Sequence, residues 1–124
     1  MQIRDILRNN PLVLAPMAGI TDLPLRIICR EMGAGLVYSE MVSAEALIRN
    51  QRKTVEMLVT DPREKPVVFQ LFGCKPSSMA GAAKLLSERE IDFIDSIWAV
   101  PCPKCCGAGQ APRSCGSWTL RRKS

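Results

Sequence analysis

An alternation of apolar runs with amphipathic segments is the feature that most restricts the fold of this chain. Four runs have the continuous apolar character of strands that are buried on both faces. They are PLVLAPMAG (11–19), GLVYSEM (35–41), VVFQLFG (67–73) and IDFID (91–95). The segments between them, 21–33, 43–59 and 76–90, have helical periodicity. The order β-α-β-α-β-α-β, with connections long enough for right-handed crossovers, predicts a parallel α/β sheet.

Capping residues indicate where the first two helical segments begin and end. Thr21 or Asp22 can cap the first helix, and Gly33 suits its C-terminus. The second helical segment is expected to break near Asn50, with Thr54 capping its second part. A proline-containing loop is expected before the third strand.

The length of the chain limits which α/β folds it can complete. A whole (β/α)8 barrel needs roughly 250 residues, and this chain has 124. The pattern therefore predicts either about three and a half βα units of a TIM barrel or the start of a doubly wound sheet. The first strand–helix turn, APMAGITD (15–22), lacks the G-x-G-x-x-G fingerprint of dinucleotide-binding domains. The chain also contains no histidine, so Ser-His and Cys-His catalysis are excluded within it.

Charge divides the chain into two parts. The net charge is +5, but residues 1–95 carry twelve Lys or Arg and all twelve acidic residues, whereas residues 96–124 carry five Lys or Arg and no acid. We therefore expect a boundary near Asp95, with an α/β part at 1–95 and a Cys-, Pro- and Arg-rich tail at 96–124. Neither an 18-residue apolar run nor a secretory signal is present, which favours a cytoplasmic protein with reduced cysteines and no membrane contact.

The candidate functional residues lie at the C-terminal ends of the predicted strands, where barrel enzymes carry their sites. These ends are PMAG (16–19), SEM (39–41) and QLFG (70–73). Small residues in PMAG allow backbone N–H groups to approach a flat or anionic ligand. Gln70 is a polar amide in an apolar strand, where burial without partners is unfavourable. The alternatives are a simple tight turn for PMAG, a helix cap for Glu40, and neighbouring backbone as the partner of Gln70.

These segments together resemble the N-terminal part of the bacterial tRNA-dihydrouridine synthases. The resemblance runs through residues 11–95 and rests on APMAGITD, SEMVSA (39–44), NQRKT (50–54) and QLFG at these spacings. It implies an FMN-binding TIM barrel, followed in the family by a helical domain. It also implies reduction of the C5–C6 double bond of uridines in tRNA, with NADPH as the reductant and a cysteine as the proton donor.

The resemblance also implies roles for individual residues. FMN contacts fall on Pro16, Met17, Ala18 and Gln70, which suits backbone groups and an amide that meet the polar edge of a flavin. A cationic cluster could contact tRNA phosphates, although solvated helix charges are the alternative. This cluster consists of Arg49, Arg52 and Lys53.

The tail departs from the family pattern, which continues as INMGCP with the catalytic cysteine and then a glycine-rich segment. Restoring one base after the Asp95 codon recovers that pattern, because it forces a Gly codon across Trp98 and Ala99 and an Asp codon across Trp118 and Thr119. We therefore predict that the tail is an out-of-frame sequence, irregular or disordered. The family's cysteine position is then occupied by Val100, so no catalytic residue is expected and this truncated chain is predicted to be unstable and inactive alone.

The residues of the chain also allow two alternative functions. Cys102-x-x-Cys105, with Cys106 and Cys115, could form a small zinc module, although the frameshift hypothesis predicts no metal. A different FMN-dependent barrel oxidoreductase, of the dihydroorotate or ene type, is the second alternative. The TDLPLR (21–26) and SEMVSA segments favour the tRNA-modifying family over it.

Overall fold

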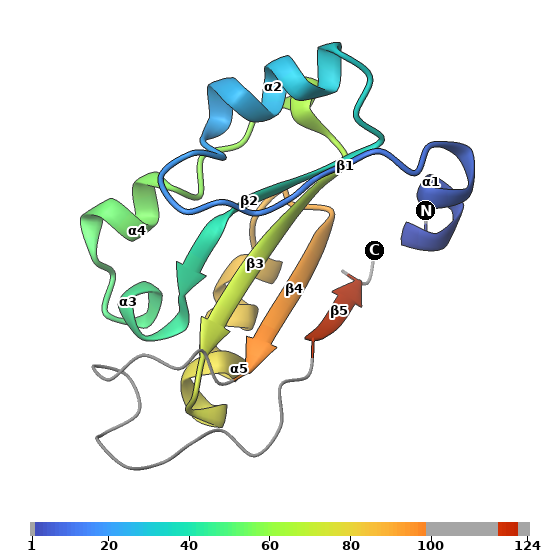
Figure 1. Cartoon of the computed structure of the whole chain (residues 1–124). Helices are drawn as coiled ribbons and strands as arrows, with labels where there is room; N and C mark the ends of the chain where they lie inside the picture. The colour runs from blue at the N-terminus through green and yellow to red at the C-terminus, as the bar shows by residue number, and fades with distance from the viewer. Residues whose placement is uncertain (1, 99–116, 122–124) are drawn as a thin grey trace.

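A five-stranded sheet forms the centre of the molecule, in the order β1-β2-β3-β4-β5. The computed structural model describes residues 2–98 and the backbone of residues 117–121. The strands are β1 Val13–Leu14, β2 Leu36–Ser43, β3 Val67–Gly73, β4 Phe93–Trp98 and β5 Ser117–Arg121. The first four strands run parallel to one another, whereas β5 is antiparallel to β4 (Figure 1). The predicted parallel α/β arrangement is confirmed.

Helices connect the parallel strands in the predicted order. These connections contain α2 Leu23–Glu31, α3 Ala44–Ile48, α4 Arg52–Glu56, the 3-10 turn η1 Pro62–Glu64 and α5 Pro76–Ser87, whereas α1 Ile3–Asn9 precedes β1. Sequential parallel strands that lie side by side, each followed by a helical connection, are the repeating arrangement of a (β/α)8 barrel. Two elements were not anticipated from the sequence, namely α1 before the first strand and β5 within the tail.

The two faces of the sheet bury different clusters. Apolar residues of β2, β3 and β4 pack against α3 and α5 in the main core, with Phe69 and Leu71 at its centre. On the opposite face, Leu36, Val68 and Phe93 form a smaller cluster. The half-buried Ile3 and Ile6, which lie one turn apart on α1, pack against this cluster and cover it.

The boundaries of the helices agree only partly with the sequence-based expectations. The predicted break at Asn50 is confirmed, since this residue has a φ of 52° between α3 and α4. Asp22 is the cap of α2, because its side chain accepts a hydrogen bond from Leu25 N–H at 3.1 Å. The prediction for Thr54 was wrong. Gln51 is the N-cap of α4, and Thr54 is buried inside that helix, since the backbone turns back into a helix immediately after Asn50.

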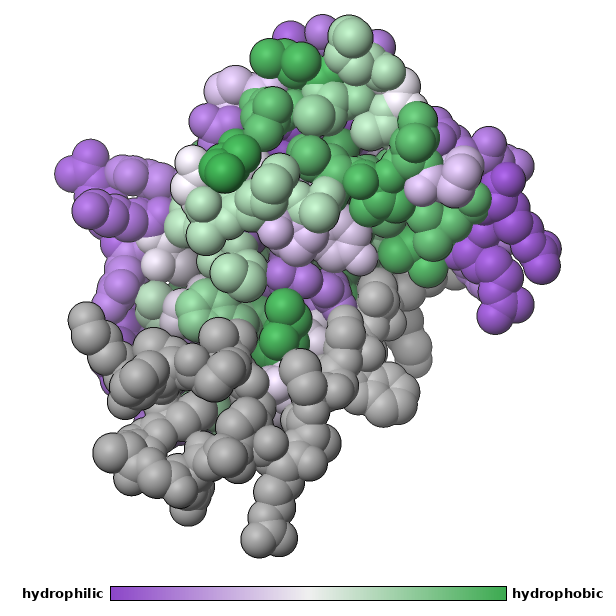
Figure 2. Space-filling model, viewed as in Figure 1, coloured by the Kyte–Doolittle hydropathy of each residue, from purple (hydrophilic) through white to green (hydrophobic). Residues whose placement is uncertain are grey.

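One surface of the molecule is apolar. Figure 2 shows hydrophobic surface over the region where α2 and β1 lie in Figure 1, with hydrophilic surface on both sides of it. The exposed apolar side chains of this region include Leu12 and Val13 at β1 and Ile28 and Met32 at α2. β1 pairs only with β2 among the described strands, so its outer edge and the neighbouring α2 surface are exposed together.

Candidate functional site

The turn after β1 is held by a buried threonine. The Thr21 hydroxyl accepts a hydrogen bond from Met17 N–H at 3.1 Å, and Met17 O accepts hydrogen bonds from the Thr21 hydroxyl and from the N–H groups of Ile20 and Thr21. Gly19 has a φ of 72°, a conformation that favours glycine. Met17 and Ala18 are exposed at this strand end. PMAG is thus a tight turn whose outer surface is available to a ligand.

A bulge in β2 connects this turn to β3. Tyr38 pairs with Val68 and Met41 pairs with Gln70, so three steps along β2 match two along β3. Bulges of this kind change the direction of side chains and are common beside functional sites. At this bulge the Glu40 carboxylate accepts a hydrogen bond from Gly19 N–H. Glu40 therefore holds the β1 turn.

Ser39 and Ser43 complete the local hydrogen bonding of this strand. The buried Ser39 hydroxyl donates to Glu40 O at 2.7 Å and accepts from Gln70 N–H at 3.3 Å. This bond satisfies a strand N–H group at the bulge. Ser43, and not Glu40, provides the side-chain cap of α3, since its hydroxyl accepts from Ala46 N–H at 3.3 Å.

Gln70 is the most unusual polar residue of the site. Its side chain is only 5% exposed, and its Nε2 donates to Asp95 Oδ2 at 2.7 Å. Its Oε1 is buried and has no hydrogen-bond partner among the described residues. The alternative that neighbouring backbone satisfies this side chain is therefore wrong. A buried carbonyl without a donor costs about 1–3 kcal/mol, which a ligand with an N–H group could recover.

Asp95 and Tyr38 form a polar layer with Gln70. Strand alternation places Gln70 and Asp95 on the same face as Val68 and Phe93, opposite α3 and α5. Burial, and secondarily the negative charge of Asp95, raises the pKa of Tyr38. The sequence analysis did not select Asp95 or Tyr38. IDFID holds two acidic residues, and the second of them, at the end of this otherwise apolar run, was the signal that could have identified Asp95.

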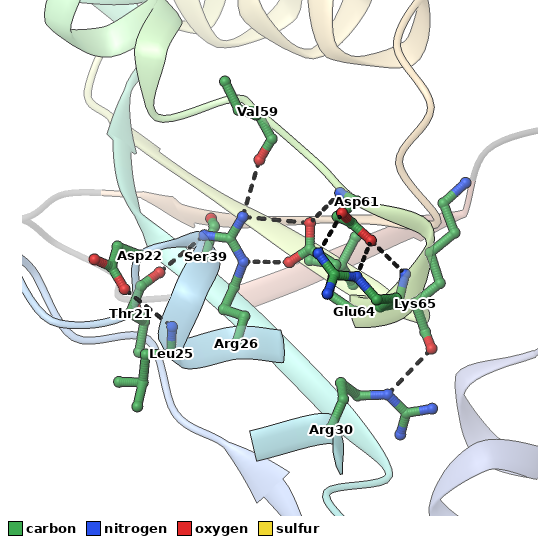
Figure 3. Close-up of polar contacts among 12 residues, drawn as sticks. Thr21, Asp22, Leu25, Arg26, Arg30, Ser39, Val59, Asp61, Glu64 and Lys65 are labelled. Carbon is green, nitrogen blue, oxygen red and sulfur yellow. Dashed lines mark hydrogen bonds and ion pairs between the residues drawn. The ribbon is translucent and has the colours of Figure 1, made fainter. Parts of the chain in front are cut away.

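Figure 3 shows a buried ion pair that lies next to Thr21, the residue that holds the turn. Arg26 of α2 pairs with Glu64 of η1 through Nε, and its two terminal nitrogens donate to Thr21 O at 2.9 Å and Val59 O at 3.0 Å. Its Cζ also lies 5.6 Å from the Phe69 ring centroid. Because Arg26 binds Thr21 O, this cluster stabilises the residue that holds the PMAG turn.

A hollow of about 710 Å³ lies beyond the ends of β2 and β3 and includes Arg49 and Lys75. Both cations lie 3.3 Å from the carboxylate of Glu45. The hydrogen bond from Lys75 is the largest cause of the lowered pKa of Glu45. Arg52 instead pairs with Glu56 along α4, at 2.7 Å. The predicted cationic cluster is thus divided, with only Arg49 among its arginines at the hollow.

The remaining sequence-based site predictions lie outside the described residues. They concern Val100 and the four tail cysteines proposed as zinc ligands, which are Cys102, Cys105, Cys106 and Cys115. Cys29 and Cys74 are the two cysteines within residues 2–98, and both are half-buried. No group of three or more potential metal ligands occurs in the described part of the chain. None of the helices described is long and apolar enough to cross a membrane.

Comparison with known proteins gives consistent matches. The family described as "Dihydrouridine synthase (Dus)" matches residues 13–105, a range that runs past the predicted boundary at Asp95. tRNA-dihydrouridine synthase B of Pseudomonas aeruginosa is 39% identical over 112 residues, which cover 90% of this chain and 32% of the relative. The corresponding protein of Pseudomonas putida is 40% identical over 115 residues, covering 93% and 32%. A probable tRNA-dihydrouridine synthase of Rickettsia typhi is 36% identical over 116 residues, covering 90% and 35%. The chain spans about a third of the length of these relatives.

Proposed function

The chain belongs to the dihydrouridine synthase family, and we propose that it forms the N-terminal part of the FMN site of a tRNA-dihydrouridine synthase. The observation that carries this proposal is the buried, unpartnered Oε1 of Gln70 on the sheet face opposite α3 and α5. In a closed barrel, that face is the interior. A ligand with an N–H donor at this point would satisfy the orphaned acceptor.

FMN fits the residues present. The pyrimidine ring of a flavin carries one N–H between two carbonyl groups, and Gln70 Oε1 is an acceptor for that N–H. Pro16, Met17 and Ala18 would border the cofactor through the turn after β1, which Thr21 holds in place. When bound and reduced by NADPH, FMN supplies the hydride for the reduction of uridine. The protein would supply position, hydrogen bonds and exclusion of water.

The tRNA substrate and the proton donor are the other parts of the proposal. Arg49 and Lys75 at the hollow beyond β2 and β3 would contact phosphates, in competition with the carboxylate of Glu45. The family's cysteine position holds Val100 in this sequence, so the chain has no proton donor at that place. We therefore propose that the 124-residue chain does not reduce uridine by itself.

A flavin titration tests the cofactor site. FMN fluorescence should be quenched on binding to the purified chain, and Gln70→Leu should weaken binding about tenfold, which corresponds to about 1.4 kcal/mol. Gln51→Leu is the matched control, because Gln51 is exposed and its side chain makes no capping hydrogen bond. Equal FMN affinity of wild type and Gln70→Leu would contradict the assignment of Gln70.

A turnover assay tests the missing proton donor. The chain is incubated with FMN, NADPH and tRNA that lacks dihydrouridine, and the modified nucleoside is then measured by mass spectrometry. We expect no dihydrouridine. Its formation would show that another residue serves as the acid and would refute the proposal for Val100.

A further inference from the structure

The side-chain amide of Gln70 has two ends in different surroundings. Its NH2 group faces the carboxylate of Asp95 at 2.7 Å, and its carbonyl oxygen has no partner among the described residues. Both residues are at least nine-tenths buried, so bulk water cannot hydrogen-bond to the two ends of the amide and make them equivalent. The adjacent strands β3 and β4 fix the pair, because Gln70 and Asp95 are direct partners in the parallel register.

The charge of Asp95 determines which end of the amide faces it. An ionised carboxylate can only accept hydrogen bonds, so the NH2 group is the end that can bind it. With the amide flipped, two oxygens would face each other at hydrogen-bonding distance, and the buried NH2 group would lose its acceptor. In a buried site of low dielectric such an arrangement is strongly unfavourable.

We propose that Asp95 is a positioning residue that holds Gln70 with its carbonyl oxygen toward the ligand, so that the site selects a molecule with an imide N–H at that point. The identity of the ligand as a flavin rests on the proposed function. A uracil ring presents the same imide group, so the shared chemistry is an N–H flanked by two carbonyls. Hydrogen bonding of the amide to the carboxylate also strengthens its oxygen as an acceptor.

The orientation of Gln70 can be measured without a ligand. In 15N-labelled full-length chain, the Nε2 protons of Gln70 should show a downfield shift and slow exchange that Asp95→Leu removes. Asp92→Asn is the control, because Asp92 lies at the start of the same strand region and accepts from Val67 N–H at 3.0 Å. Asp95→Asn keeps the volume of the side chain if the leucine variant does not fold, and it should reduce the shift. Unchanged Gln70 signals in a folded Asp95 variant would overturn the proposal.

Ligand discrimination provides the second measurement. Wild type and Asp92→Asn should bind FMN about tenfold more tightly than FMN methylated at N3, whereas Asp95→Leu should show a preference below about threefold. Asp95→Asn should fall between them, because an asparagine can either accept from or donate to Gln70. A full tenfold preference in a folded Asp95 variant would overturn the proposal.

The two proposals can fail separately. If wild type binds neither flavin, the cofactor assignment is refuted, and the Gln70 resonances still decide the role of Asp95. The same binding comparison is made with uridine monophosphate and its N3-methyl derivative, which carry the imide group of uracil. Discrimination between these two, with none between the flavins, would support the role of Asp95 and identify the imide as that of uracil.

Discussion

Replacing Glu64 by Gln should destabilise the chain more than any change to a surface ion pair. Arg26 and Glu64 are 2% and 0% exposed, and the substitution leaves the guanidinium buried without its counter-charge. The two backbone carbonyls of Thr21 and Val59 remain as acceptors, but neither carries a full charge. Breaking one side of a buried pair costs about 3–5 kcal/mol. For a domain of typical stability, this is a large part of the free energy of unfolding.

Urea denaturation followed by circular dichroism measures this loss. The matched control is Glu56→Gln, because Glu56 also pairs with an arginine, Arg52, but the two side chains are 59% and 92% exposed. We expect this control to change the free energy of unfolding by about 0.5 kcal/mol or less. A loss below about 1 kcal/mol for Glu64→Gln would refute the reasoning.

A double substitution separates the cost of an unpaired charge from the loss of packing. Arg26→Met with Glu64→Met removes both charges, and apolar replacement of a buried pair is often neutral or stabilising. The double variant should therefore be more stable than Glu64→Gln alone. If the loss of stability in the double variant equalled the sum of the losses in Arg26→Met and Glu64→Met, this reasoning would be contradicted. Because Arg26 also binds Thr21 O, Glu64→Gln should weaken FMN binding through the β1 turn.

Three further predictions concern the turn after β1 and the acid stability of the chain. Glu40→Gln should weaken FMN binding about tenfold, since the Gly19 N–H then loses a charged acceptor worth about 1.5 kcal/mol; an unchanged titration would contradict this. Gly19→Ala should lower the free energy of unfolding by about 1 kcal/mol in urea, because alanine is strained at a φ of 72° even though its Cβ would meet no atom within 4 Å. Hydrogen bonding to Arg63 lowers the pKa of Asp61 from 3.8 to about 2, so its stabilising contribution is complete above pH 3.8 and disappears as the pH falls through about 2. Asp61→Asn should therefore flatten the loss of stability over this interval, and an acid titration identical to wild type would show that the pair does not contribute.

The strands and the amide of the site were predictable because their signals are local. The apolar run VVFQLFG corresponds to β3, and Gln70 stood out as a polar residue within it. The contact between Glu40 and Gly19 depends on a bulge, and no local pattern in the sequence specifies that extra residue. Arg26 lies in an amphipathic helix, where an arginine is normally expected on the surface. Its partner Glu64 is 38 residues away in a segment expected to be a loop, so only the folded chain shows the buried pair.

The polar layer explains why residues of this part of the chain depend on one another although each belongs to a different strand. Gln70 is held by Asp95 of β4 and by Ser39 of β2, and the same bulge places Glu40 against the turn after β1. All four parallel strands thus contribute to one site in the order expected of a barrel. β5 departs from this order, since it is antiparallel to β4 at the edge where a (β/α)8 barrel continues with a parallel strand. Barrel pairing therefore extends through β4 in the described chain, and the proposed flavin site is confined to β1, β2, β3 and β4.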